Sequence, residues 1–127
     1  MDLICRRPVA SLHEADAFVP SPGGVVANVA ATAARHGAAV SQAGGAGDDP
    51  WGSWLRDRLA AAGVELRWFG LAEGCATAVA FVTLDAAGEP SWQLYGDGAA
   101  AVLRAAGDVL LDAVEATDAL FLSLIHI

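Results

Sequence analysis

The stretch GGVVANVA, residues 23–30, decides how this chain is expected to fold and what it is expected to hold. Two glycines lead into small residues typical of a helix, and Asn28 falls one turn inside that helix. Paired glycines let a ligand approach bare backbone, because no Cβ stands in the way. The helix start offers N–H groups and the positive end of a dipole, and an asparagine amide both donates and accepts hydrogen bonds. The stretch therefore predicts a cradle for a small ligand with neighbouring hydroxyls.

Composition limits the class of protein to which this cradle belongs. The chain has 127 residues, 55% of them hydrophobic, and a net charge of −8. That length suits one domain that buries roughly two thirds of its unfolded surface. The negative charge argues against nucleic acid or an anionic membrane as partner, since both require a surface rich in Lys and Arg. No apolar run approaches the ~18 residues of a membrane span, so we expect a cytoplasmic protein.

Cysteine and histidine do not suggest a metal site. Cys5 and Cys75 have no pairing or metal-ligand spacing, so we interpret them as small buried hydrophobic residues in a reducing compartment. The three histidines lie far apart in the sequence, with no second ligand near any of them. We therefore expect no metal ligands.

The first half of the chain predicts alternating strands and helices. Residues 2–5 are interpreted as the end of a buried strand, and residues 9–22 as one or two short strands and a turn. A helix is predicted from about Val25 to His36, with glycine at position 37 to end it. Residues 38–43 are interpreted as a second parallel strand that ends in the glycine run GGAG.

The second half begins with a helix start, DDP at 48–50, which places an acidic cap before a proline. Strands are predicted at 64–71, 76–84, 91–95 and 119–122, with a loop over 96–107 and a helix at 108–116. The turn residues at 85–90 predict an antiparallel hairpin, which often forms a lid. Strands separated by helices indicate a parallel sheet with helices on both faces, and such sheets bind ligands beyond the carboxyl ends of their strands.

An ordered set of positions runs through these elements. It comprises Gly23, Gly24, Asn28, Ala30, Gly37 and Gly47, then Asp48, Asp49, Gly52, Gly63 and Val64, and finally Thr77, Asp85, Gly88 and Glu89. In this spacing the chain resembles the N-terminal part of the PfkB (ribokinase-like) carbohydrate kinases, up to about residue 121. The resemblance implies an α/β, ribokinase-like three-layer fold, truncated, with a parallel sheet, helices on both faces and a small β lid at about 76–95.

The resemblance also implies an activity and a site. The family transfers the γ-phosphoryl group of ATP, with Mg²⁺, to a sugar hydroxymethyl group. Asp2, Gly23, Gly24 and Asn28 match sugar-contacting positions. Tyr95 is either a lid contact or a core residue of the hairpin. A homodimer formed through the lid is expected of the parent protein.

The chain departs from the family in three ways. Val26 replaces a usual Gly, Ala or Pro, which crowds the cradle. Gly96 stands where several members carry Arg, which weakens any expectation of an acidic or phosphorylated substrate. The family's anion-binding glycines, catalytic aspartate and ATP pocket belong to its second half and have no counterpart here. We therefore expect no catalytic residue and no bound ATP in this chain alone.

Both ends look cut. The last residues, LSLIHI at 122–127, resemble the in-frame translation of a sequencing-library adapter, so we expect a non-native tail. We also expect a marginally stable, aggregation-prone piece of a longer protein.

Two functions stay open. The first is the acceptor-binding half of a fructokinase-like or 2-keto-3-deoxygluconate-kinase-like enzyme, inactive alone. The second is a non-catalytic sugar- or nucleoside-binding module. A dinucleotide-binding unit around residues 44–47 is a weaker third interpretation, since the G-x-G-x-x-G spacing is missing.

Overall fold

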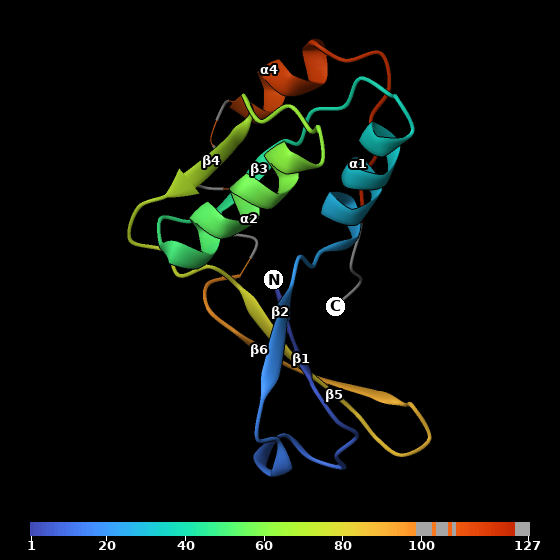
Figure 1. The fold of residues 1–127 in the computed structure, drawn as a ribbon. Coiled ribbons are helices and arrows are strands. Elements are labelled where there is room, and N and C mark those ends of the chain that lie inside the picture. The colour runs from blue at the N-terminus through green and yellow to red at the C-terminus, as the bar shows by residue number, and fades with distance from the viewer. Residues whose placement is uncertain (99–102, 104–106, 108, 124–127) are drawn as a thin grey trace.

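A computed structural model describes residues 1–98, 103, 107 and 109–123 of the chain. The strands are β1 (Asp2–Cys5), β2 (Phe18–Ser21), β3 (Gly44–Gly47), β4 (Phe69–Ala72), β5 (Val79–Leu84) and β6 (Pro90–Tyr95). The helices are the 3-10 turn η1 (Leu12–Glu14), α1 (Val25–Arg35), α2 (Pro50–Ala61) and α4 (Val109–Glu115). Figure 1 shows two parts: a body of helices around β3 and β4, and a sheet that projects from it.

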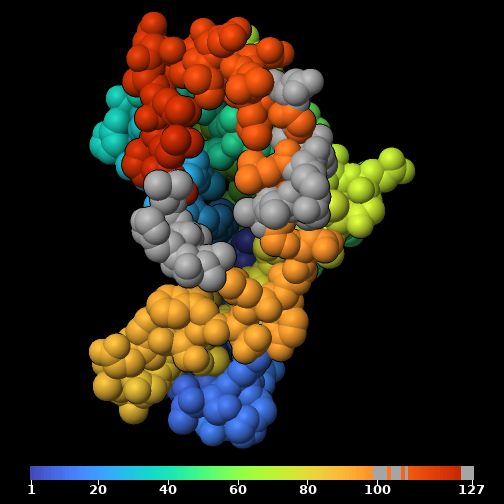
Figure 2. Space-filling model, turned by 180° about the vertical axis from the view of Figure 1, so that it is seen from behind, coloured from blue at the N-terminus to red at the C-terminus, as the bar shows by residue number. Residues whose placement is uncertain are grey.

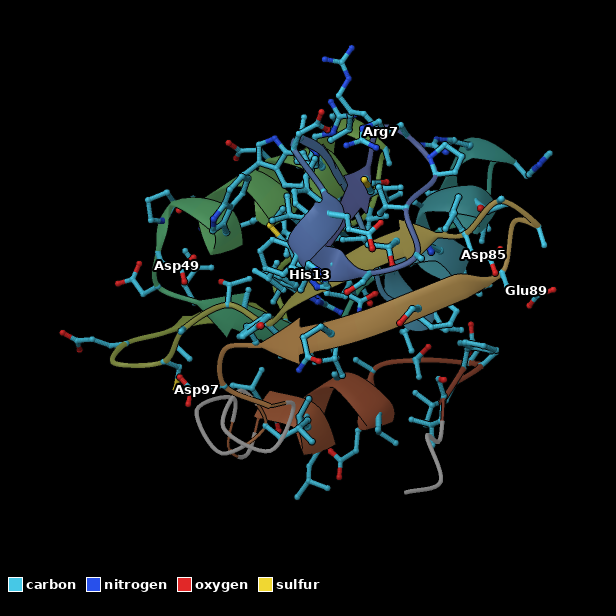
Figure 3. All side chains as sticks on the ribbon, turned by 90° about the horizontal axis from the view of Figure 1, so that it is seen from below. Arg7, His13, Asp49, Asp85, Glu89 and Asp97 are labelled. Carbon is cyan, nitrogen blue, oxygen red and sulfur yellow. The ribbon has the colours of Figure 1, made fainter. Side chains whose placement is uncertain are left out.

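The body is built on the parallel pair of β3 and β4, which runs from Gly44 beside Phe69 to Gly47 beside Ala72. Helix α2 lies on one side of this pair and α4 on the other (Figures 1 and 3). The predicted arrangement of parallel strands between helices is therefore present in the described part of the chain. Helices α1 and α2 meet in a small core, because the alanines of α1 allow a close approach. The buried members of that core are Ala30, Leu59 and Val64.

The predicted helix ends are confirmed. Gly37, with φ +87°, and Gly63, with φ +86°, follow the ends of α1 and α2 in the left-handed conformation that glycine adopts without steric cost. Asp49 is the N-cap of α2, and its carboxylate accepts the N–H of Gly52 at 2.8 Å. The cap and the proline at position 50 thus define the start of α2 as the sequence indicates.

Two strand predictions are wrong in position. Residues 38–43 form no strand. Only Ser41 makes an isolated parallel bridge, to Glu65, and the strand is the glycine run itself. A Cβ at Gly45 would overlap the carbonyl of Gly70, so glycine is required where the two strands approach each other. The matching strand is likewise four residues long, at Phe69–Ala72, and does not fill 64–71. The run GGAG has a composition typical of a loop. In this fold its glycines allow β3 and β4 to pair closely.

A third strand prediction, at residues 119–122, is also wrong. The structure has no strand there, and α4 ends at Glu115. A strand forms only where a neighbour supplies hydrogen-bonding partners, and no described strand pairs with this stretch. The predicted loop at 96–107 and the predicted non-native tail at 122–127 lie in large part outside the described residues.

The projecting part is a four-stranded sheet in the order β2-β1-β5-β6, here called the arm sheet. The predicted hairpin is confirmed as β5 and β6, which pair antiparallel from Val79 beside Tyr95 to Leu84 beside Pro90. Strand β1 pairs antiparallel with β2 and parallel with β5. Residues 2–5 form a strand as predicted, and this strand belongs to the arm sheet and not to the parallel pair of the body. A short apolar run indicates a strand, but it does not indicate which sheet receives it.

Candidate functional site

A cleft of about 980 Å³ lies where the body meets the arm sheet. It is lined by residues 22–28 at the start of α1, by residues 42–46 at β3, and by Thr77, Ala78 and Asp97 at the base of the β5–β6 hairpin. Figure 2 shows a hollow between the two parts from behind, with the N-terminal segment, dark blue, at its floor. The cleft therefore has the glycine pair on one wall and the base of the arm sheet on another.

Asp2 and Gly23 meet at the edge of this cleft. Strand β1 begins at Asp2, whose register partner in β2 is Ser21, so the chain passes Asp2 again as it leaves β2. A Cβ added at Gly23 would overlap the Asp2 carboxylate. The structure thus brings together an acidic group and bare backbone that lie 21 positions apart in the sequence.

Gly24 and Asn28 continue the same wall. Gly24 is the N-cap of α1 and has φ +106°, a conformation that strains any residue with a Cβ. Its carbonyl accepts the N–H of Asn28 at 2.9 Å, which closes the first turn. The Asn28 side chain is exposed and lines the cleft. Three of the five predicted site residues, namely Gly23, Gly24 and Asn28, therefore line one cleft, and a fourth, Asp2, adjoins Gly23.

Tyr95 is not part of this group. Asp2 pairs with Ala80 and Ala80 with Leu94, so Leu94 shares the face of Asp2, while Tyr95 points from the other face. The Tyr95 ring packs edge-to-face on Phe81, with ring centroids 5.4 Å apart, and lines a separate hollow beside Phe18. The residue is 53% exposed, so the choice between a lid contact and a core residue of the hairpin stays a prediction.

Sequence reasoning missed the cluster at the base of the arm sheet. Thr77 is 5% exposed; its N–H donates to Asp49 Oδ2 at 2.7 Å and its hydroxyl to Asp49 Oδ1 at 2.8 Å. Beside it, Asp97 Oδ2 accepts the N–H of Ala76 at 2.6 Å. The DDP motif identifies Asp49 as a helix cap, but no local pattern indicates a partner 28 residues away.

Burial and hydrogen bonds act in opposite directions on the pKa of the Asp49 carboxylate. Burial raises the pKa of Asp49, but the N–H groups of Thr77 and Gly52 and the Thr77 hydroxyl outweigh burial and hold the pKa below its ordinary value. At the cleft, burial lowers the pKa of the Met1 amino group, against the opposing effect of the Asp2 charge. The Asp49 carboxylate is thus kept ionised by bonds that also fix its orientation.

The part of the chain that the structure describes has neither a metal-binding cluster nor a membrane-spanning helix. No group of three or more His, Cys, Asp or Glu side chains there could hold a metal ion. No helix in that part of the chain is long and apolar enough to cross a membrane. The residues 44–47 are a strand and not a phosphate-binding turn, which removes the basis for a dinucleotide site.

Comparison with known proteins adds sequence and structural relatives. Residues 1–126 match the pfkB family carbohydrate kinase. Fructokinase-2 of Solanum lycopersicum is 37% identical over 114 residues, which cover 90% of this chain and 35% of that protein. An uncharacterized sugar kinase from Pyrococcus horikoshii superposes with a TM-score of 0.69 at 35% identity, over 74% of this chain and 32% of that one, and has also been solved in complex with ATP. A fructokinase from Xylella fastidiosa gives a TM-score of 0.62 at 39% identity, over 74% and 29%.

The matched proteins are much longer than this chain. The chain spans about a third of the length of the proteins it matches. Within that third, the structural likeness confirms the ribokinase-like α/β class that the sequence resemblance implies. The match of nearly every residue to one family model shows that the chain belongs to the pfkB family of carbohydrate kinases.

Proposed function

We propose that this chain is the acceptor-binding part of an ATP-dependent sugar kinase and that a sugar lies in the cleft between α1 and the arm sheet. The observation that carries the proposal is the meeting of the Asp2 carboxylate with the Gly23 backbone at the edge of that cleft. In this arrangement Asp2 accepts hydrogen bonds from sugar hydroxyls and Asn28 bridges two neighbouring hydroxyls. The arm sheet, which includes the predicted hairpin at 76–95, is the lid.

The chemistry assigned to this chain is positioning. Holding an acceptor hydroxyl in one orientation supplies a large part of the acceleration of a transfer reaction. The parent enzyme would use ATP with Mg²⁺, as the sequence resemblance implies, and the transfer itself would need groups outside this chain. Fructose or a 2-keto-3-deoxygluconate-like acid is the proposed acceptor. A cytoplasmic location and a homodimer through the arm sheet belong to the same proposal.

The binding part of the proposal is tested by titrating the chain with fructose in a calorimeter. We expect binding, and we expect Asp2→Asn to weaken it by about tenfold or more, because a site that holds sugar hydroxyls loses a charged acceptor. Glu89→Gln, which neutralises an exposed carboxylate in the hairpin turn, is the control and should bind as the unmodified chain does. Equal affinity of Asp2→Asn and Glu89→Gln would count against the assigned site.

The catalytic part is tested on the complete gene product that contains this sequence. ATP-dependent phosphorylation of fructose or of 2-keto-3-deoxygluconate would support it. Fructose binding without transfer by that complete protein would instead indicate a non-catalytic sugar-binding module.

A further inference from the structure

Two connections join the arm sheet to the body. One is the segment 22–24, which leads from β2 into α1 and contains the glycine pair. The other is the base of the β5–β6 hairpin, where residues 76–78 enter the sheet and residues 96–97 leave it. Among the residues that the structure describes, only the second connection is held by side-chain hydrogen bonds to a helix of the body.

The Asp49 carboxylate is shared between the body and the arm sheet. Its Oδ1 accepts the N–H of Gly52 at 2.8 Å, which caps α2, and the hydroxyl of Thr77 at 2.8 Å. Its Oδ2 accepts the N–H of Thr77 at 2.7 Å. The N–H of Gly47, at the end of β3, in turn donates to the Thr77 hydroxyl at 3.1 Å. One carboxylate and one buried threonine therefore join the ends of β3, α2 and the arm sheet.

The other strand of the hairpin is tied to the same place. Asp97 accepts the N–H of Ala76 at 2.6 Å and donates its own N–H to the Ala76 carbonyl at 3.0 Å. A Cβ at Gly96 would overlap the carbonyl of Thr77, so the two ends of the hairpin are in contact. Figure 3 shows Asp49 and Asp97 at one end of the hairpin, opposite the turn that carries Asp85 and Glu89.

We propose that Asp49 is a positioning residue that pins the base of the β5–β6 hairpin through Thr77, and so sets where the arm sheet stands over the cleft. The inference rests on the proposed function, in which the arm sheet covers a bound sugar. A carboxylate that only capped α2 would need one hydrogen bond, to Gly52. The two bonds to Thr77 are additional, and they are directed at the arm sheet.

The pin is tested by amide hydrogen exchange in the full chain, comparing Asp49→Asn with Asp48→Asn. Asparagine also caps helices well, but its side chain offers one acceptor oxygen where aspartate offers two. Either the N–H of Gly52 or the N–H of Thr77 therefore loses its hydrogen bond to residue 49. Asp48 is exposed and carries the same charge one residue earlier, so its variant controls for charge. We expect Asp49→Asn to speed exchange of the β5 and β6 amides by about tenfold or more, with α1 unchanged and Asp48→Asn without effect. Acceleration confined to the first turn of α2, or spread evenly over the body, would overturn the pin.

A second pair of variants decides the question if Asp49→Asn does not fold. Thr77→Ser keeps the hydroxyl, and Thr77→Val keeps the shape but removes it. The pin predicts exchange in β5 and β6 near that of the unmodified chain for Thr77→Ser, and an increase of about tenfold for Thr77→Val. Equal exchange in the two variants would show that the hydroxyl does not hold the arm sheet.

Fructose binding gives a readout that a purely structural cap would not change. Asp49→Asn should weaken fructose affinity by about tenfold, because the arm sheet no longer stands in place over the cleft, whereas Asp48→Asn should not. If the unmodified chain binds no fructose, the proposed function fails, and the exchange experiments still decide whether Asp49 holds the hairpin. Unchanged fructose affinity in a folded Asp49→Asn variant would overturn the positioning role.

Discussion

Gly23 is the residue at which a single methyl group would disturb the candidate site. Its backbone conformation suits any residue, but an added Cβ would overlap the Asp2 carboxylate. We expect Gly23→Ala to displace that carboxylate and to weaken fructose binding by about tenfold or more, with a small change in stability.

Gly24→Ala is the matched variant for Gly23→Ala. The nearest atom to an added Cβ at Gly24 is 3.9 Å away, at Ala27, but φ is +106°. Gly24→Ala should therefore act mainly by lowering the free energy of unfolding. Calorimetric titration and urea unfolding of the two variants separate the effects, and a Gly23→Ala protein with unaltered affinity would contradict the assignment.

Asp49 should make the stability of the chain depend on pH. Its hydrogen bonds lower the folded-state pKa below the unfolded value of about 3.9, so the stabilisation is fully present above that unfolded value. It is lost as pH falls through the lower, folded value, where the carboxylate takes up a proton. We expect the urea midpoint to fall on acidification from about pH 5, and to fall less in Asp49→Asn. Asp48→Asn should retain the full dependence; a variant curve parallel to that of the unmodified chain would refute the role of Asp49.

At the residue scale, the sequence predicts what local chemistry determines. Gly24 and Asp49 follow from backbone freedom and helix-end preferences, and the structure has them as the N-caps of α1 and α2. A sugar-binding role for Gly23, Gly24 and Asn28 stays a prediction. Tyr95 could not be assigned in the same way. Its face depends on the register between β5 and β6, and a shift of one residue in that register would have turned it toward the cleft.

At the scale of elements, Gly52 connects α2 to β3 and the arm sheet. A Cβ at this position would overlap the Gly47 carbonyl and lie 3.0 Å from the Thr77 hydroxyl oxygen. Because one of these neighbours is backbone and the other is buried, neither can move easily. We expect Gly52→Ala to lower the free energy of unfolding by about 3 kcal/mol.

Gly37→Ala is the control for this prediction. Nothing lies within 4 Å of an added Cβ there, and only the positive φ opposes the change. Its cost should be about 1 kcal/mol. Urea unfolding measures both variants, and an equal cost would show that the contact between α2 and β3 tolerates a methyl group.

The sequence predicts whether a segment is a helix or a strand better than it predicts which strand it pairs with. Helices α1 and α2 carry their own start and stop signals, and the turn at 85–90 contains the residues that a hairpin needs, so these elements are confirmed nearly as predicted. The position of β3, the sheet that receives β1 and the absence of a strand at 119–122 depend on contacts between distant segments. No local pattern carries that information, since strand periodicity is the same in either sheet.

At the scale of the whole molecule, the arm sheet presents an apolar surface. Trp92 is 59% exposed and Leu94 70%, and both share the face of Asp2 because they pair with Val82 and Ala80. Val19, 50% exposed, pairs with Ile4 on that same face. Apolar side chains gathered on one face favour association of two copies, which agrees with the proposed homodimer through the arm sheet.

Sedimentation equilibrium tests this expectation directly. We expect the unmodified chain to self-associate and the double variant Trp92→Ser/Leu94→Ser to raise the dissociation constant by tenfold or more, because two large apolar contacts are lost at the centre of the patch. Leu111→Ser, which removes a 66% exposed leucine from α4, is the matched control and should associate as the unmodified chain does. If Leu111→Ser disperses the chain as effectively as the double variant, association is a general property of its apolar surface and the arm sheet is not the interface. If the unmodified chain is monomeric at every concentration, the homodimer must be abandoned, while the sugar site, which uses residues of one copy, is unaffected.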